Sequence, residues 1–239
     1  MGRRALWTAI RDTLTEEIAR GHYRPGDRLP PEVQLAARFG VNRHTVRRAL
    51  SSLAEAGTVQ SRRGAGVFVA HRATDYPIGQ RVRFTRNLTA SGHVPDKQVL
   101  HLAARGADPR EAAALHLDPG AMVQVYEGLS YSDGQPLALF RSVFPGDRFP
   151  RMLDALRETP SVTAAFRAHG LLDYTRASTR VTAKPAAPTQ ALHLGLQPGA
   201  PILRTVSVNV DAAGIPVEYG HTWFAGDRVT LTMGEDGPD

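Results

Sequence analysis

Hydrophobic residues near the start of the chain fall on a single helical stripe. Leu6, Ile10, Leu14 and Ile18 stand four residues apart, with polar and charged residues between them. Positions four apart lie above one another on the same side of an α-helix. The pattern therefore predicts an amphipathic helix over residues 6–20.

Two further helices are predicted on either side of a glycine. The segment 23–31 is rich in proline and glycine, and after it Leu35 and Phe39 share one helical face before Gly40. Asn42 is a good N-cap for the next helix. The inward positions of that third helix, which ends before Gly57, are Val46, Ala49, Leu50 and Leu53. Two helices joined by a tight glycine turn predict a helix-turn-helix.

A basic hairpin is predicted directly after the third helix. Two β-prone runs, 58–61 and 67–70, flank the sequence Arg-Arg-Gly-Ala-Gly at 62–66. This composition is typical of a hairpin tip, so the helices and the hairpin form a winged helix-turn-helix over residues 1–72. Residues 73–79 mix Asp, Pro and Gly without periodicity and predict a linker to a second domain, 80–239.

The second domain contains a degenerate internal repeat with an offset of about eighty residues. The motif ALHL followed by PGA occurs at 114–121 and again at 191–200, and DGQPL at 133–137 corresponds to AGIPV at 213–217. Each copy predicts a short helix, a Pro-Gly turn and two strands. Clear strand patterns lie at 122–131, 202–210, 99–103 and 179–183, and a helical pattern lies at 161–168. The prediction is an α+β domain with an antiparallel sheet and a pseudo-twofold.

Composition narrows the class of protein. The 239 residues are 42% hydrophobic and contain no cysteine, which excludes disulfides, thiolate metal sites and cysteine nucleophiles. No apolar run approaches the roughly 18 residues of a membrane span. Arg11, Asp12 and Glu16 interrupt any signal-peptide core. We therefore expect a soluble, cytoplasmic protein that does not bind a membrane.

Charge is distributed unevenly between the two predicted domains. Residues 1–72 hold 13 arginines and no lysine against 6 acidic residues, whereas residues 73–239 hold 16 basic against 17 acidic residues. A positive field on a small N-terminal domain favours a polyanionic partner, and double-stranded DNA is the one that a winged helix-turn-helix binds.

The candidate DNA contacts lie at the start of the third helix and at the hairpin tip. Arginine presents a fork to guanine or to phosphate, threonine can contact phosphate or a thymine methyl group, and glycine allows close backbone approach. The alternatives are an arginine-rich surface helix and a solvated hairpin. The candidates are Arg43, His44, Thr45, Arg47, Arg48, Arg62, Arg63, Gly64 and Gly66.

Polar residues in sheet-like surroundings of the second domain are candidate ligands of a small molecule. They are Arg83, Thr85, Asn87, Arg141, Arg176, Arg180 and Glu218. Arginines that converge on a pocket suit a carboxylate, phosphate or phosphonate, although structural ion pairs would explain each one equally well.

Catalysis has no support in the sequence. The nine histidines are scattered singly, and no HExxH, GxSxG, Walker A or EF-hand pattern occurs. We therefore expect no catalytic residues, no metal and no cofactor.

These motifs match a known family. The stretch 23–69, with PGDRLPPE, LAARFGVNRHTVRRAL and GAGVFV, resembles the winged helix-turn-helix of the GntR family of bacterial transcription regulators. The resemblance implies that Arg43, Thr45, Arg47 and Gly64 contact DNA and that Glu32 is the acid opening the second helix. A basic residue is common in the family where this chain has Ala65.

The rest of the chain is similar to a ligand-sensing domain. GQRVRF at 79–84, the two ALHL motifs, SDGQPLAL and PVEY resemble the UTRA domain of the HutC branch, which has a chorismate-lyase-like fold. The runs 81–95 and 176–183 look most like PhnF-type regulators of phosphonate metabolism, which implies a phosphonate or phosphate ester as effector. Gly128 and Ser130 stand where arginines are frequent in these domains.

Together these features predict a function. We expect a homodimeric repressor that binds an inverted-repeat operator and responds to a small anionic effector. Two alternatives are an enzyme of the chorismate-lyase type with a DNA-binding appendage, and an architectural DNA-binding protein without a ligand.

Overall fold

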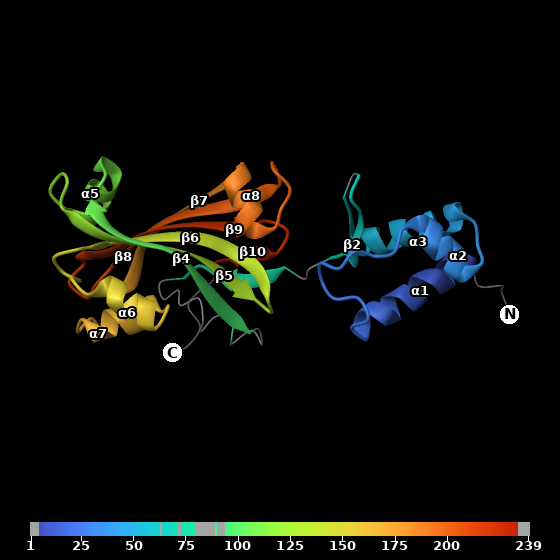
Figure 1. Cartoon of the computed structure of the whole chain (residues 1–239), viewed down its shortest axis with the longest axis horizontal. Helices are drawn as coiled ribbons and strands as arrows, with labels where there is room; N and C mark the ends of the chain where they lie inside the picture. The colour runs from blue at the N-terminus through green and yellow to red at the C-terminus, as the bar shows by residue number, and fades with distance from the viewer. Residues whose placement is uncertain (1–4, 63, 71–72, 80–88, 90–93, 234–239) are drawn as a thin grey trace. The chain divides into compact units, whose positions relative to one another are not determined.

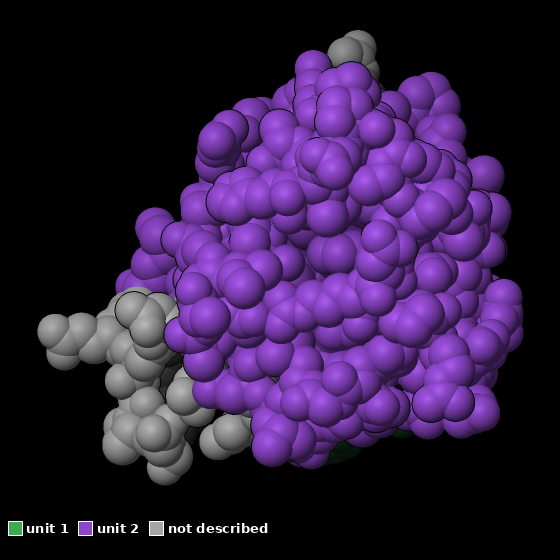
Figure 2. Space-filling model, turned by 90° about the vertical axis from the view of Figure 1, so that its left-hand side faces the viewer, with its two compact units in different colours: residues 1–72 green, residues 73–239 purple. Residues whose placement is uncertain are grey.

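The computed structural model describes residues 5–62, 64–70, 73–79, 89 and 94–233, apart from the side chain of Arg62. The chain divides into two compact units, residues 1–72 and residues 73–239 (Figure 1). Figure 2 is a space-filling view of the second unit, seen from the left-hand side of Figure 1.

Unit 1 is a three-helix domain with a small hairpin. Its core is a single cluster that includes Ile10 and Leu14 from the first helix and Val46 and Leu50 from the third. The helical stripes predicted from the sequence are therefore the buried faces. The elements are α1 (Leu6–Ala19), α2 (Glu32–Phe39), α3 (Arg43–Glu55), β1 (Val59–Arg62) and β2 (Gly66–Val69).

The hairpin of unit 1 has a third strand-like segment that the sequence did not indicate. Residues 27–29 pair with β2, because Leu29 N donates to Val67 O at 2.8 Å and Val69 N donates to Asp27 O at 2.9 Å. The Pro/Gly-rich connection before α2 is thereby attached to the wing.

Unit 2 is built on a six-stranded antiparallel sheet in the order β4-β5-β6-β9-β8-β7. The α+β fold with an antiparallel sheet is as predicted. The strands are β4 (Pro95–Gly106), β5 (Met122–Ser132), β6 (Gln135–Pro145), β7 (Thr175–Pro185), β8 (Pro201–Val210) and β9 (Pro216–Ala225).

The register of the two central strands shows how the sequence repeat is used. Arg141 of β6 pairs with His221 of β9, and these residues are eighty positions apart. On either side of that pair, Leu139 faces Trp223 and Val143 faces Tyr219. The pseudo-twofold of the domain therefore passes between β6 and β9, next to Arg141 and His221.

Helices cover the two faces of the sheet differently (Figure 1). The repeat helices α5 (Pro109–Leu115) and α8 (Pro188–Leu194) lie on one face, whereas α6 (Met152–Glu158) and α7 (Val162–Ala168) lie on the other. Tyr126 packs in the core under α6 and α7, and its neighbour Val125 packs in the core under α5. Helix α6 was not predicted from the sequence.

A strand occupies the segment that the sequence analysis assigned to a linker. β3 (Thr74–Pro77) runs parallel to β10 (Val229–Thr232) and belongs to unit 2. Tyr76 anchors it, since this residue is buried and its ring lies 5.1 Å from that of Phe224. Four residues are too few to show a strand period, and their partner strand is more than 150 positions away.

Candidate DNA interface and effector site

The first turn of α3 is fixed by the predicted cap. The Asn42 side-chain oxygen accepts hydrogen bonds from the backbone N–H and the hydroxyl of Thr45, both at 2.9 Å. In the absence of DNA, the hydroxyl of Thr45 therefore donates its hydrogen bond to the capping residue Asn42. Since Val46 is fully buried on the inner face, Arg43 and Arg47 are held on the solvent side.

A carboxylate on α2 orients both of these arginines. Glu32 accepts from Arg47 at 3.0 Å and 2.8 Å, and Arg43 lies 3.6 Å from the same carboxylate. The hydrogen bond from Arg47 is the main cause that lowers the pKa of Glu32. The carboxylate thus stays charged at neutral pH and keeps two cationic side chains together on the exposed side of the helix-turn-helix.

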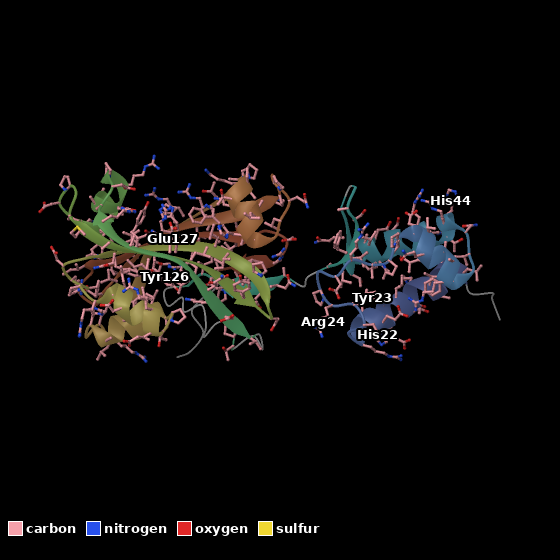
Figure 3. All side chains as sticks on the ribbon, in the orientation of Figure 1. His22, Tyr23, Arg24, His44, Tyr126 and Glu127 are labelled. Atoms are coloured by element: carbon pink, nitrogen blue, oxygen red, sulfur yellow. The ribbon has the colours of Figure 1, made fainter. Side chains whose placement is uncertain are left out.

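The other two α3 candidates behave differently from one another. His44 is exposed and unshielded at the upper edge of unit 1 in Figure 3. Arg48 instead lies over the ring of Trp7 on α1, with the guanidinium carbon 4.8 Å from the ring centroid. This cation–π contact directs Arg48 toward α1.

The wing is short and its tip needs glycine. Gly64 has φ +75° with open space where a Cβ would stand, and Gly66 has φ +110°. Such φ values are costly for residues with a Cβ. The side chain of Arg62 and the whole of Arg63 lie outside the described residues, so the predicted basic tip is placed only through its backbone at Arg62, which pairs with Gly66.

In unit 2, a buried carboxylate organises polar groups on the sheet face under α6 and α7. Glu218 accepts from Ser142 Oγ at 2.5 Å and from Asn209 Nδ2 at 2.7 Å. Arg176 Nε in turn donates to Asn209 Oδ1 at 3.4 Å. The structure therefore brings together two of the predicted effector residues, Arg176 and Glu218, through an asparagine that the sequence analysis did not select.

Further polar groups surround this cluster. The Lys97 ammonium lies 5.4 Å from the centroid of the Phe140 ring, where burial lowers its pKa and the charge of Glu218 opposes that shift. Burial also raises the pKa of Tyr76 to about 12. Among the described residues, Tyr126 Oη and Thr179 Oγ1 are buried without a hydrogen-bond partner. Unpaired buried polar atoms are rare in folded proteins, so these two are natural contacts for a ligand.

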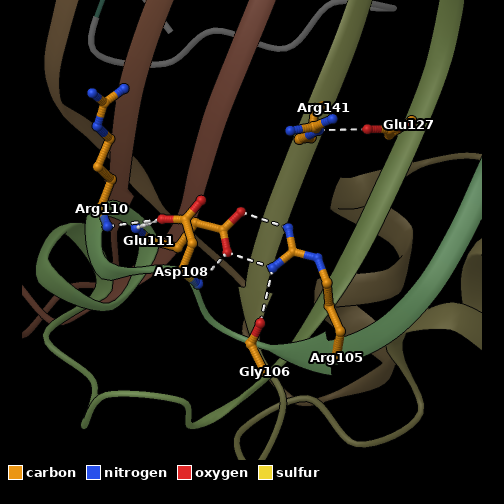
Figure 4. Close-up of polar contacts among 7 residues, drawn as sticks. All are labelled: Arg105, Gly106, Asp108, Arg110, Glu111, Glu127 and Arg141. Atoms are coloured by element: carbon orange, nitrogen blue, oxygen red, sulfur yellow. Dashed lines mark hydrogen bonds and ion pairs between the residues drawn. The ribbon is translucent and has the colours of Figure 1, made fainter.

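The remaining predicted arginines do not join this cluster. Arg141 forms an ion pair with Glu127 on the opposite face of the sheet (Figure 4), and Figure 3 shows Tyr126 and Glu127 on opposite sides of β5. Arg180 lines a groove of about 690 Å³ beside α5 on that same opposite face. The expectation that Arg141, Arg176 and Arg180 converge is therefore wrong. Arg83, Thr85 and Asn87 lie outside the described residues.

A β-bulge explains the separation of Arg176 and Arg180. Residues four apart on a regular strand share a face. The register of β7 against β8 shifts between Arg176 and Ser178, which inserts one residue. Arg176 consequently faces the side of Asn209, while Arg180 pairs with Val206 on the other side. A sequence pattern with strict alternation does not reveal such an insertion.

Two other structural features are absent from the described part of the chain. No helix there is long and apolar enough to cross a membrane. No group of three or more His, Asp or Glu side chains there is arranged to hold a metal ion.

A winged helix-turn-helix with exposed arginines, followed by a domain with a buried polar cluster, defines a DNA-binding regulator with a sensory domain. Two family models match the chain: the gntR family of bacterial regulatory proteins over residues 6–69 and the UTRA domain over residues 90–230. The chain belongs to the GntR family of transcription regulators and carries the UTRA domain of its HutC branch. The family is one of regulators, not of enzymes, which removes the lyase alternative.

Individual relatives agree with this assignment over almost their whole length. RB1450, an HTH-type transcriptional regulator of Rhizobium meliloti (strain 1021), is 42% identical over 96% of this chain and 94% of its own. The HTH-type transcriptional repressor PhnF of Mycolicibacterium smegmatis is 31% identical over 87% of this chain and 84% of its own. The crystal structure of PhnF from Mycobacterium smegmatis superposes with a TM-score of 0.65, at 29% identity, over 96% of this chain and all of that one.

Proposed function

We propose that this chain is a cytoplasmic, homodimeric repressor that binds an inverted-repeat operator and is controlled by a small anionic effector. The observation that carries the DNA-binding half is the pair Arg43 and Arg47, exposed on α3 and held together by Glu32. Unit 1 supplies the DNA contacts, and unit 2 supplies the effector site and the dimer contacts. The similarity to a protein described as a repressor supports repression.

A dimer follows from the size of the DNA-binding unit. One winged helix offers a short recognition helix and a single wing tip to DNA. Two copies on a shared frame multiply affinity, because binding of the second copy becomes intramolecular. Twofold symmetry of the protein then corresponds to an inverted repeat in the operator.

The buried cluster in unit 2 supports an anionic effector. Among the described residues, Lys97 and Arg176 place positive charges near the carboxylate of Glu218, and hydroxyls of Ser142 and Tyr126 lie on the same face. Such cations and hydroxyls suit an anion that accepts charge-assisted hydrogen bonds. A phosphonate or phosphate ester is our first candidate, and the resemblance to PhnF-type regulators favours it.

Calorimetry tests the effector site. Titration with alkylphosphonates, inorganic phosphate and sugar phosphates should show binding of at least one of them to the wild-type protein. Arg176→Ala should weaken that binding by about 10- to 100-fold, as expected for loss of a hydrogen bond to a charged group. Arg180→Ala, on the opposite face of the sheet, should leave it within about twofold. If no anion binds, or if Arg180→Ala alone abolishes binding, the proposed effector site is wrong, whereas the DNA-binding proposal is unaffected.

A further inference from the structure

Arg28 lies in the connection between α1 and α2, in the part that pairs with strand β2 of the wing. Its neighbours Asp27 and Leu29 hydrogen-bond to β2, and Arg28 itself bridges to Phe68 of that strand. Four residues later, Glu32 holds Arg43 and Arg47. Four residues of chain span at most about 14 Å. Arg28 therefore lies beside the wing and, along the chain, close to the acid that holds the α3 arginines.

The guanidinium of Arg28 occupies a place that glycine leaves open in the wing. A Cβ built at Gly66 would lie 2.8 Å from Arg28 Nε and 3.2 Å from Nη2. A real Cβ would have to displace that side chain. Gly64, by contrast, has open space at the same position. Gly66 therefore leaves room for the side chain of Arg28 against the wing backbone. Gly64 has no such neighbour.

Arg28 has no acceptor among the described residues of unit 1. Its side chain is exposed, and no described residue forms an ion pair or a side-chain hydrogen bond with it. Other arginines of the unit are paired, as Arg38 is with Glu17 and Arg47 with Glu32. A seated guanidinium without a carboxylate partner has all of its N–H groups available for an outside anion.

We propose that Arg28 is a phosphate ligand for DNA, placed by Gly66 between the groove entered by α3 and the strand contacted by the wing. This assignment rests on the proposed DNA-binding function. Arginine binds phosphate through a fork of charge-assisted hydrogen bonds, and such backbone contacts fix register without reading bases. Arg28 is therefore a positioning contact that acts on every DNA sequence alike.

Fluorescence anisotropy with a selected operator and an unrelated duplex tests the proposal. Arg28→Ala should weaken binding to both duplexes by about 3- to 10-fold and should reduce the slope of log K against log salt by about one. Arg24→Ala is the matched control, because Arg24 is exposed in the same loop but lies at the opposite edge of unit 1 from His44 (Figure 3). It should leave affinity and salt slope unchanged. Thermal melting verifies that both variants are folded.

Gly66→Ala provides a second, independent test. It should weaken binding by itself, and in the Arg28→Ala background the further loss should be smaller, since displacement of Arg28 no longer contributes and only the strain of alanine at φ +110° remains. The proposal is overturned if wild-type protein binds its operator and Arg28→Ala binds it with the same affinity and salt slope. It is also overturned if Arg24→Ala is weakened equally. A wild-type protein that selects no operator would instead overturn the proposed function itself.

Discussion

At the scale of single residues, the proposed DNA contact requires Arg47 to exchange the carboxylate of Glu32 for the edge of a guanine base. Its pair with Glu32 is solvent-exposed, with more than half of the arginine side chain accessible, and exposed pairs contribute about 0–1 kcal/mol. A bidentate contact to guanine contributes about 1–3 kcal/mol of discrimination. The contact of Arg47 with guanine is therefore more favourable than its ion pair with Glu32. In the absence of DNA, Glu32 holds the two arginines in place.

Substitution of the α3 arginines should separate specific from general binding. Arg43→Ala or Arg47→Ala should cost about 1–3 kcal/mol in operator affinity and should relax base preference, because we propose that these side chains reach base edges. Arg62→Ala at the wing should weaken all sequences alike. Competition of the operator against unrelated DNA measures the difference. Unchanged operator affinity in both α3 variants would remove the recognition helix from the account.

At the scale of elements, the start of α5 shows how a repeat helix is secured. Glu111 is buried and accepts two hydrogen bonds from Arg105, at 2.6 Å and 2.7 Å (Figure 4). Its carboxylate also accepts from the backbone N–H of Asp108, whose side chain caps the helix in return. This network joins β4 to α5 and is structural, since it lies on the sheet face opposite Glu218.

Loss of that network should be visible in the pH dependence of stability. The hydrogen bonds from Arg105 are the main cause that holds the pKa of Glu111 below its usual 4.5. A depressed carboxyl pKa contributes stability above that value and loses it as the pH falls through the folded-state pKa. Glu111→Gln should therefore lower stability by about 1–2 kcal/mol at pH 7, since Arg105 is partly exposed and water screens the pair, and the gap to wild type should close in acid.

Thermal melts from neutral pH to about pH 3 measure this gap. A change of 1 kcal/mol corresponds to about 2–4 °C in a domain of this size. Glu158→Gln is the control, because this carboxyl is exposed on α6. A gap between Glu111→Gln and wild type that stayed constant over the whole range would contradict the assignment.

The elements also show what a sequence can and cannot predict. The helices of unit 1 and the repeated strands of unit 2 follow from local period and from the eighty-residue offset. The bulge at Arg176, the strand at Tyr76 and the seat of Arg28 at Gly66 depend on contacts between distant segments. The candidate site was therefore half predicted: Arg176 and Glu218 were named, while Asn209 and Lys97 were missed. The run of Thr205, Ser207 and Asn209 on one face of β8 was the available signal.

At the scale of the whole molecule, unit 2 should dimerise without unit 1. The fragment 73–239 keeps β3, whose Tyr76 is part of the unit 2 core. Sedimentation at micromolar concentration should give a dimer, because specific dimers bury about 800 Å² per partner and the described part of unit 1 exposes only Leu6 and Val33 among its large hydrophobic side chains. A monomer would mean that dimerisation requires unit 1 or DNA.

Effector and operator should influence one another equally. β3 follows unit 1 directly along the chain and belongs to unit 2. The hydroxyl of its Tyr76 interacts electrostatically with Arg176 and Glu218. An inducer that weakens operator binding by some factor must itself bind that much more weakly to the DNA complex. Titrations of the effector with and without operator DNA should give matching factors. Unequal factors would mean that the anion acts at more than one site.

The most direct test of the central claim is selection of DNA from a random pool by the full-length protein and by Arg47→Ala. Wild-type protein should enrich an inverted repeat whose half-site centres are separated by about one helical turn or a multiple of it. Arg47→Ala should enrich the same repeat with at least one base position no longer specified. Failure of the wild-type pool to converge, or identical pools from the two proteins, would contradict a regulator that reads its operator through α3.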